Sequence, residues 1–415
     1  MNRKLLAVVG LAGISALALA GCSATPADDG GPVTITYSNF ISNGGNEDNL
    51  AKIVSAFEKA NPNIKVDVTT LPYGDYGTAL QTDIAGGSQA DVFDIDGASN
   101  YGPLQANGVL AELDGVDGSV YNKALLDTYA TDGKQYGLPT SFSDVVLYFN
   151  KDLFDAAGVE YPTADWTWAD ETAAAEKITD AGAGVFGDHQ PVTYNEYYKV
   201  LVQNGETFLN ADSTKAAFNT KGGIEAAHWL VDKSGTTMPT IEQGQGTADF
   251  DTNLFKDGKL GMLHTGIWVF GAFADTPANW DIAVEPGNTT QASAVFSNAV
   301  GVSAASKHIA EAQKWAEFLS SSDDEVNVRL DAGWELPTIA DTAKLNTYLD
   351  KGKPANRQAV FDAAAKIAPA PAVGAHQSEM QDIITGELIE AQAGRETVEQ
   401  ALTNAETKIN ALLAS

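Results

Sequence analysis

The sequence predicts an α/β protein built from two domains, and three observations support this prediction. Its 415 residues exceed the size at which a single hydrophobic core keeps growing. Between residues 33 and 95, strand patterns alternate with helix patterns, which is typical of a parallel sheet flanked by helices. Near the middle of the chain, Val145 to Phe149 form an unbroken apolar run that predicts a buried strand, and such a strand could connect two lobes.

The N-terminus reads as an export signal. A positively charged start precedes an apolar run that ends near Cys22, the only cysteine of the chain. Leu19-Ala20-Gly21-Cys22 looks like a bacterial lipobox, in which cleavage leaves the cysteine thiol to carry a diacylglycerol. A free thiol behind an ordinary signal peptide is the alternative. We expect residues 1–21 to be a signal peptide and residues 22–32, which contain little to bury, to be a lipidated, flexible tether.

Polar loops follow the first and the third predicted strands. The expected elements of this region are strands 33–37, 64–68 and 91–95 and helices 49–60 and 76–85. Ligands of such sheets bind beyond the carboxyl ends of the strands. Carboxylates and amides pair with hydroxyl groups, and aromatic faces cover the CH side of a sugar ring, although the same polar residues also dominate ordinary turns. The candidate ligand-binding residues in these loops are Asn39, Phe40, Asn43, Glu47, Asp96 and Asn100.

The stretch around the central strand carries a family resemblance. Pro139 keeps the chain extended ahead of the strand, so Ser143 and Asp144 are polar groups presented at the edge of a buried region. The proline turn, the strand and Asn150-Lys151-Asp152-Leu153 resemble the crossover of extracellular solute-binding proteins of ABC importers. The similarity is to the sugar-binding family that includes maltose-binding protein.

Later segments extend this resemblance. Phe255 to Trp268 is similar to the family pattern Phe-x-x-Gly-x-x-Ala-Met-x-x-x-Gly-x-Trp, which implies that Trp268 is an aromatic platform, with core packing as the alternative. Gly394 to Leu402 resembles the final helix of the family. The remaining candidates are Tyr194 and Asn195, expected before a helix where relatives place a stacking aromatic, and Trp334 and Glu335, expected at the hinge, where interlobe packing is the alternative.

The resemblance implies a specific architecture. We expect a two-lobe fold like that of periplasmic binding proteins, in which each lobe is a mainly parallel sheet flanked by helices and about three crossings form the hinge. The first lobe would contain residues 33–143 and about 296–334. The second lobe would contain residues 144–295 and about 335–415.

The implied function is that of a lipid-anchored receptor outside the cytoplasmic membrane. It would bind a carbohydrate, expected to be a neutral oligosaccharide, between two closing lobes and deliver it to the permease of an ABC importer. We expect a monomer without a cofactor, exported and held at the outer face of the membrane by Cys22. The net charge of −30 disfavours nucleic acid as a partner. The five histidines are scattered singly, which disfavours a metal site built on them.

Two other classes of function remain open from the sequence. Asp96, Asp144 and Glu335 could serve as the carboxyl pair of a surface glycosidase. A binding protein for another solute, such as a peptide or a polyamine, is the second alternative. The candidate sites are poor in Lys and Arg, so an acidic ligand would lack a bidentate partner.

Overall fold

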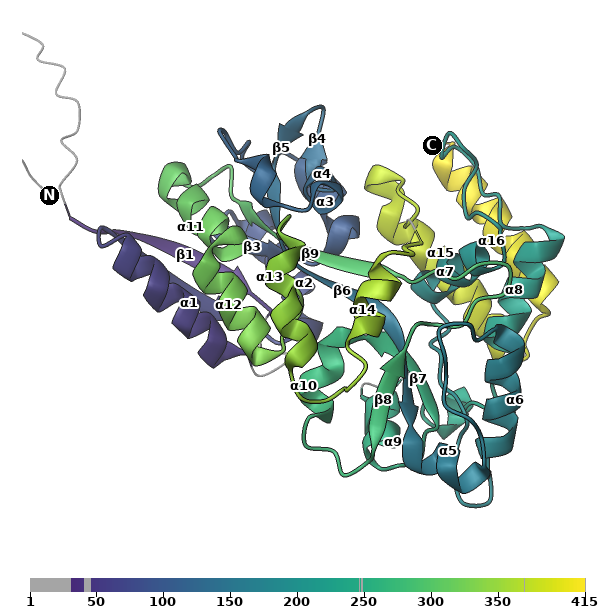
Figure 1. Cartoon of the computed structure of the whole chain (residues 1–415). Coiled ribbons are helices and arrows are strands. Elements are labelled where there is room, and N and C mark those ends of the chain that lie inside the picture. The colour runs from purple at the N-terminus through teal and green to yellow at the C-terminus, as the bar shows by residue number, and fades with distance from the viewer. Residues whose placement is uncertain (1–30, 41–45, 246, 248, 369, 415) are drawn as a thin grey trace, which may run out of the picture.

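The computed structural model describes residues 31–40, 46–245, 247, 249–368 and 370–414, and in this part of the chain helices pack around a seven-stranded sheet (Figure 1). Cys22 and Asn43 lie outside the described residues. The predicted α/β class is confirmed. Every strand and helix expected between residues 33 and 95 is present, with ends that differ from the predicted ones by up to three residues.

The element bounds are as follows. The strands are β1 Val33–Asn39, β2 Ile64–Thr70, β3 Val92–Ile95, β4 Ala130–Thr131, β5 Lys134–Gln135, β6 Gly137–Asn150, β7 Met262–Gly266, β8 Trp280–Ala283 and β9 Val295–Val302. The helices of the first half are α1 Glu47–Ala60, α2 Tyr73–Gly86, α3 Gly97–Ala106, α4 Lys123–Asp127, α5 Lys151–Ala157, α6 Trp168–Ile178 and α7 Tyr194–Gln203. Those of the second half are α8 Lys221–Val231, α9 Phe250–Lys256, α10 Phe270–Phe273, α11 Ile309–Ser321, α12 Asp323–Ala332, α13 Thr342–Leu345, α14 Gln358–Ala364, α15 Gln377–Gln392 and α16 Val398–Leu413.

The sheet changes its strand pairing along its width. β1 pairs in parallel with β2 and with β3, as the alternating pattern of the first hundred residues predicts. β9 then pairs antiparallel with β3, and β6 pairs antiparallel with β9, β7 and β8. The pairs made by β6 are antiparallel because the chain returns along β7, β8 and β9 in the opposite direction.

Strand β6 joins the two parts of the sheet. Its first half, Gly137 to Asp144, pairs with β9, and its second half, Val145 to Asn150, pairs with β7 and β8. A third segment lies alongside, because Phe142 and Leu336 exchange backbone hydrogen bonds of 2.9 and 3.1 Å. Three chain segments therefore cross the middle of the molecule side by side, which agrees with the expected hinge.

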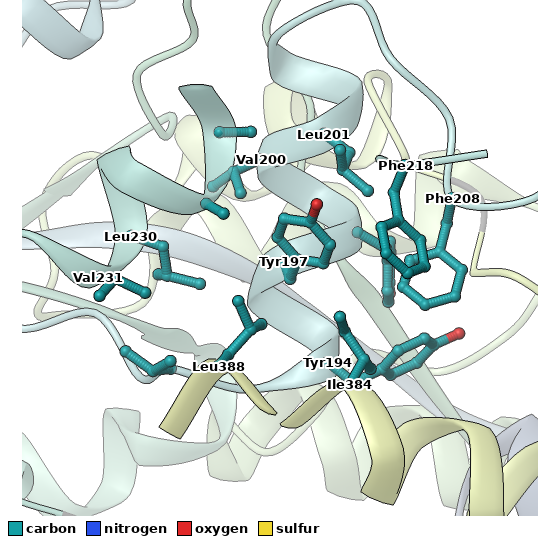
Figure 2. Close-up of a cluster of buried hydrophobic side chains, with 14 of the residues drawn as sticks. Tyr194, Tyr197, Val200, Leu201, Phe208, Phe218, Leu230, Val231, Ile384 and Leu388 are labelled. Carbon is teal, nitrogen blue, oxygen red and sulfur yellow. The ribbon is translucent and has the colours of Figure 1, made fainter. Parts of the chain in front are cut away.

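Separate hydrophobic clusters lie on either side of these crossings. In one of them α11 packs against β1 and α1, where Trp315 makes edge contacts with Tyr37 and Phe57 at centroid distances of 5.5 and 5.1 Å. In another, α7, α8, α15 and α16 enclose a cluster around Tyr197 (Figure 2). The lobe boundaries themselves stay a prediction. Among the described helices, none has the length and the hydropathy needed to cross a bilayer.

Candidate functional site: a cavity at the chain crossings

A cavity of about 360 Å³ lies where the carboxyl ends of β1 and β3 approach β6, β9 and the segment after β7. This volume falls within the range of small-molecule sites. The polar and aromatic side chains come from both sides of the crossings. The lining residues are Tyr37, Phe40, Asn46, Tyr73, Asp94, Asp96, Thr140, Ser141, Asn195, Trp268, Phe296, Asn298, Leu319, Arg329, Trp334 and Glu335.

The fold brings six of the sequence-predicted residues to this cavity. They are Phe40, Asp96, Asn195, Trp268, Trp334 and Glu335. Other candidates from the same loops lie elsewhere. Asn39 is buried at the end of β1, and Glu47 is exposed in the first turn of α1. Asn100 is exposed on α3, where its side-chain amide donates to the carbonyl oxygen of Asp96 at 2.6 Å.

Ser143, Asp144 and Tyr194 are buried and do not line the cavity. Ser143 Oγ accepts a hydrogen bond of 3.1 Å from the N–H of Ile267, so it holds the backbone next to Trp268. Burial raises the pKa of Asp144 well above its ordinary value, and the nearby Glu285 carboxylate raises it further. Helix α7 begins at Tyr194, not after it, because Thr193 caps the helix. Tyr194 consequently points into the hydrophobic cluster of Figure 2.

The indole ring of Trp268 lies close against the backbone of Gly266. A Cβ atom at Gly266 would lie 1.9 Å from Cζ3 of Trp268, so only glycine lets the indole fold back over the end of β7. The indole packs edge-on against Phe296 at a centroid distance of 5.3 Å, and 39% of its surface stays exposed. Phe40 and Tyr73 form a second aromatic pair on the β1 side, with centroids 5.6 Å apart. The cavity therefore has aromatic surfaces on both sides.

Carboxylates line the β1 and β3 side of the cavity. Tyr37 donates a 2.6 Å hydrogen bond to Asp94 Oδ1. Burial raises the pKa of Asp94 to about 7, although the hydrogen bonds from Tyr37 and the Phe40 N–H and the charge of Arg329 lower it. Burial also raises the pKa of Asp96, and the hydrogen bond from Tyr73 opposes this shift. These carboxyl groups can accept from, or when protonated donate to, the hydroxyl groups of a ligand.

Arg329 places a cation in the wall, which was not predicted from the sequence, beside the carboxyl groups of Asp94, Asp96 and Glu335. Its guanidinium lies 4.1 Å from the centroid of the Trp334 ring and bonds to the buried carboxylate of Glu325. Its Nη1 lies 3.8 Å from Glu335 Oε2, which accepts a 2.7 Å hydrogen bond from Ser141. Because carboxylates surround this guanidinium, the site still disfavours an anionic ligand.

Asp94→Asn tests the ionisation of the site. The pKa of Asp94 is about 7 in the folded chain and 3.8 as an ordinary carboxyl, so the folded state holds the proton more tightly between these values. The stability that the protonated Asp94 carboxyl contributes is fully present below pH 3.8 and is lost as the pH rises through 7. Between pH 4.5 and 6.5, the free energy of unfolding of the wild type should therefore fall, relative to that of the variant, by about 1.4 kcal/mol for each pH unit. Urea titrations of both proteins across this range measure the difference, and a constant difference would contradict the raised pKa.

Several lining residues were not predicted from the sequence. Asp94 lies inside β3 and Arg329 inside α12, and both are buried. The residues around Asp94 predict the interior of a strand, and those around Arg329 predict a charged helix face, so neither pattern indicates a binding site. Tyr73 begins α2, three residues ahead of the expected helix start. A detectable signal existed for Arg329, because it lies one turn before Gly333-Trp334-Glu335 at the end of its helix.

The sequence profile of the bacterial extracellular solute-binding proteins matches residues 43–326. The chain belongs to this family. The predicted resemblance is thus confirmed, and the family is one of binding proteins, which favours a receptor over a glycosidase. The export that the family description implies agrees with the predicted location outside the cytoplasmic membrane.

Individual members of this solute-binding family are similar over most of the chain. An ABC substrate-binding protein of Listeria monocytogenes, solved in complex with cycloalternan, is 41% identical, with a TM-score of 0.87, covering 92% of this chain and 99% of that chain. The cyclic α-maltosyl-1,6-maltose binding protein of Arthrobacter globiformis is 26% identical with a TM-score of 0.74, covering 92% and 99%. The arabinooligosaccharide-binding protein of Bacillus subtilis (strain 168) is 25% identical over 325 residues, which is 74% of each chain.

Proposed function

We propose that this solute-binding protein captures a neutral oligosaccharide in the cavity at the chain crossings and delivers it to the permease of an ABC importer. The observation that carries the proposal is the pairing of aromatic surfaces with hydroxyl-binding groups around one cavity. Trp268 and Phe296 lie on one side, Phe40 and Tyr73 on the other, and carboxyl and amide groups lie between them. Aromatic faces bury the apolar face of a pyranose, and the polar groups satisfy its hydroxyls.

The charge of the cavity supports a neutral ligand. Asp94, Asp96 and Glu335 outnumber Arg329 among the charged residues that line it. An anionic sugar would meet these carboxylates, whereas hydroxyl groups can donate to them. A polyamine would also suit the acidic groups and could place its ammonium groups over the aromatic faces, so the preference for an oligosaccharide rests on the sugars named for the similar proteins.

Cyclic oligosaccharides are the first ligands to test. Two of the similar structures belong to proteins named for, or solved with, a cyclic sugar, and one of them is 41% identical to this chain. We propose that the present cavity takes a ligand of the same kind. We also propose that the two predicted lobes, residues 33–143 with 296–334 and residues 144–295 with 335–415, close over it.

Intrinsic tryptophan fluorescence of the chain starting at Ser23 tests the proposal, because Trp268 and Trp334 line the cavity. The titrants are cycloalternan, a linear gluco-oligosaccharide with the same number of rings, an arabinooligosaccharide, a tetrapeptide and spermidine. We expect saturable binding of a sugar, tighter for the cyclic one, with the sugar recovered intact. Cleavage of the sugar would establish a glycosidase, and saturation only with the peptide or spermidine would refute a carbohydrate receptor.

We further propose that a lipid on Cys22 holds the protein at the outer face of the cytoplasmic membrane. The support is the small-small-cysteine sequence that follows the apolar run. A single acyl chain gives weak membrane binding, and a diacylglycerol supplies the two chains that stable anchoring requires. Partition of the full-length protein, expressed in a bacterial host, into detergent phase is the expected result. Recovery in the aqueous phase would refute the anchor.

A further inference from the structure

A second group of ionisable side chains comes from α6, which holds Glu171, from β7, which holds His264, and from Asp188 between them in the sequence, and none of the three lines the cavity that holds Trp268. His264 Nε2 lies 3.1 Å from Glu171 Oε1 and 3.3 Å from Asp188 Oδ1. The side chains are 3%, 1% and 1% exposed, respectively. One nitrogen and two carboxylate oxygens from distant parts of the sequence thus face one another in the interior.

One carboxylate of this group retains an oxygen without a hydrogen-bond donor. Lys233 Nζ donates to Glu171 Oε1, Asp188 Oδ2 and Gln190 Oε1 at 2.6, 2.7 and 2.8 Å, and these three bonds use all the protons of the ammonium. Glu171 Oε2 has no hydrogen-bond partner among the described residues, and Asp188 Oδ1 faces His264 Nε2 at 3.3 Å. A buried carboxylate oxygen is costly to leave unpaired, so Glu171 Oε2 indicates a further occupant.

The other face of the imidazole is held as in metal sites. Glu285 Oε1 lies 2.7 Å from His264 Nδ1, and Glu285 is fixed in turn by Lys199 at 2.6 Å. A ring nitrogen that donates to a carboxylate leaves the opposite nitrogen free to act as a ligand, and this carboxylate–histidine arrangement orients most metal-binding histidines. With Nδ1 facing Glu285, Nε2 faces Glu171 and Asp188.

The charges of the group also leave room for a divalent cation. The buried carboxylates are Glu171, Asp188, Glu196 and Glu285, and the lysines paired with them are Lys199 and Lys233. These six side chains carry two negative charges in excess. A proton on His264 would balance one of them, and a divalent ion balances both.

We propose that Glu171, Asp188 and His264 bind a divalent transition-metal ion, with Zn²⁺ as the preferred ion. Bonds of about 2.0–2.1 Å in a tetrahedron place neighbouring ligand atoms roughly 3.3 Å apart, which matches the 3.1 and 3.3 Å separations around Nε2. A mixed nitrogen and oxygen set suits Zn²⁺ better than Ca²⁺ or Mg²⁺. Binding displaces any proton on Nε2 into solvent. The fourth position is open to water or to Glu171 Oε2.

The proposed metal site is next to a second cavity, through which an ion can enter. Glu171 and Asp188 line a second cavity of about 620 Å³ between α6 and α8, whose rim carries the exposed Glu225. His264 lies in β7, the strand that ends at Gly266 beneath Trp268. A bound ion would therefore tie α6 to the strand that presents Trp268. This inference does not depend on the identity of the ligand in the first cavity.

Metal binding by the chain starting at Ser23, stripped with a chelator and dialysed, tests the site directly. We expect one equivalent of Zn²⁺ by calorimetry, and with Co²⁺ the intense visible ligand-field absorption of tetrahedral coordination. We also expect Zn²⁺ to raise the melting temperature, since an ion that binds only the folded chain stabilises it. Wild-type protein that takes up no stoichiometric Zn²⁺ and gives no such Co²⁺ absorption would overturn the proposal without any variant.

Variants then locate the ion. Glu285→Gln keeps the shape of the orienting group and should weaken Zn²⁺ binding by about 10–100-fold, while Asp188→Asn removes a ligand and should weaken it at least as much. Glu225→Gln, on the rim of the same cavity, is the matched control and should bind as the wild type does. Circular dichroism establishes that each variant is folded. Unchanged affinity in folded Glu285→Gln and Asp188→Asn proteins would assign the bound ion to another site and refute this one.

Discussion

Replacing Trp268 by alanine should weaken oligosaccharide binding roughly 30-fold, which corresponds to a loss of about 2 kcal/mol. The indole is 39% exposed at the wall of the cavity and meets Phe296 edge-on, so one of its faces is available to a sugar ring. Large aromatic side chains that are covered only when the ligand binds typically dominate binding energy. The dissociation constant, measured by calorimetry with the sugar that binds the wild type, gives the result.

The matched control is Tyr161→Ala. Tyr161 is 38% exposed and packs beside Phe149 and Phe154 in the α5 region, so its removal takes away a comparable exposed aromatic. We expect the dissociation constant of this variant to equal that of the wild type. The Trp268→Ala protein should unfold near the wild-type temperature, because the neighbours that pack into the core are Ile267 and Val269. Wild-type affinity in Trp268→Ala would remove the indole from the binding site.

Trp268 also indicates how far the sequence could predict the site. Its pattern contains the physical cause of its position, because Gly266 is required for the indole to fold back over the strand end. Phe40 and Asp96 were predictable for a similar reason, since residues just beyond the carboxyl ends of parallel strands face the ligand side of a sheet. A local sequence pattern can therefore identify a site residue when the strand or turn that contains the residue is enough to fix its position.

Residues whose position depends on a distant element were missed. Arg329 reaches the cavity because α12 packs against α1 and directs its guanidinium beneath Trp334, which no local pattern encodes. Asp94 lies between the apolar residues Phe93 and Ile95 in β3, and only the contact with Tyr37 of the neighbouring strand reveals a titrating group. Conversely, the sequence predicts Tyr194 ahead of a helix, but Thr193 caps the helix, which begins at Tyr194, and the ring belongs to a hydrophobic core.

The sequence predicts the strand pairing of residues 33–95 well, but it does not predict the pairing of β6. Residues 33–95 form consecutive strand–helix units whose three strands pair with one another in parallel, as the alternation of strand and helix patterns predicts. The partners of β6 lie more than a hundred residues further along the chain. Their antiparallel direction depends on the long path through α5 to α9, which hydrophobic periodicity does not report.

Lys199→Met should lower the free energy of unfolding by about 3 kcal/mol, measured by urea denaturation at neutral pH. Lys199 is fully buried and lies 2.5 Å from Glu196 and 2.6 Å from Glu285. Burial lowers the pKa of its ammonium, but these two carboxylates raise the pKa above its ordinary value, so the group is charged. Methionine preserves the volume and removes the charge. Two buried carboxylates then lose their cation, and the hydrogen bonds that the described residues leave to them are those with Gln190 and His264.

Lys123→Met is the matched control, because it breaks an ion pair of the same length in water. Lys123 lies 2.6 Å from Asp127, but the two side chains are 83% and 57% exposed. Water solvates both charges there, so the pair adds little and its loss should leave the urea midpoint unchanged. The two substitutions differ mainly in burial, and the difference between their midpoints therefore measures what desolvation adds to an ion pair in this protein. Equal effects would mean that the buried carboxylates take up protons when Lys199 is lost, and the loss in Lys199→Met would then grow as the pH rises.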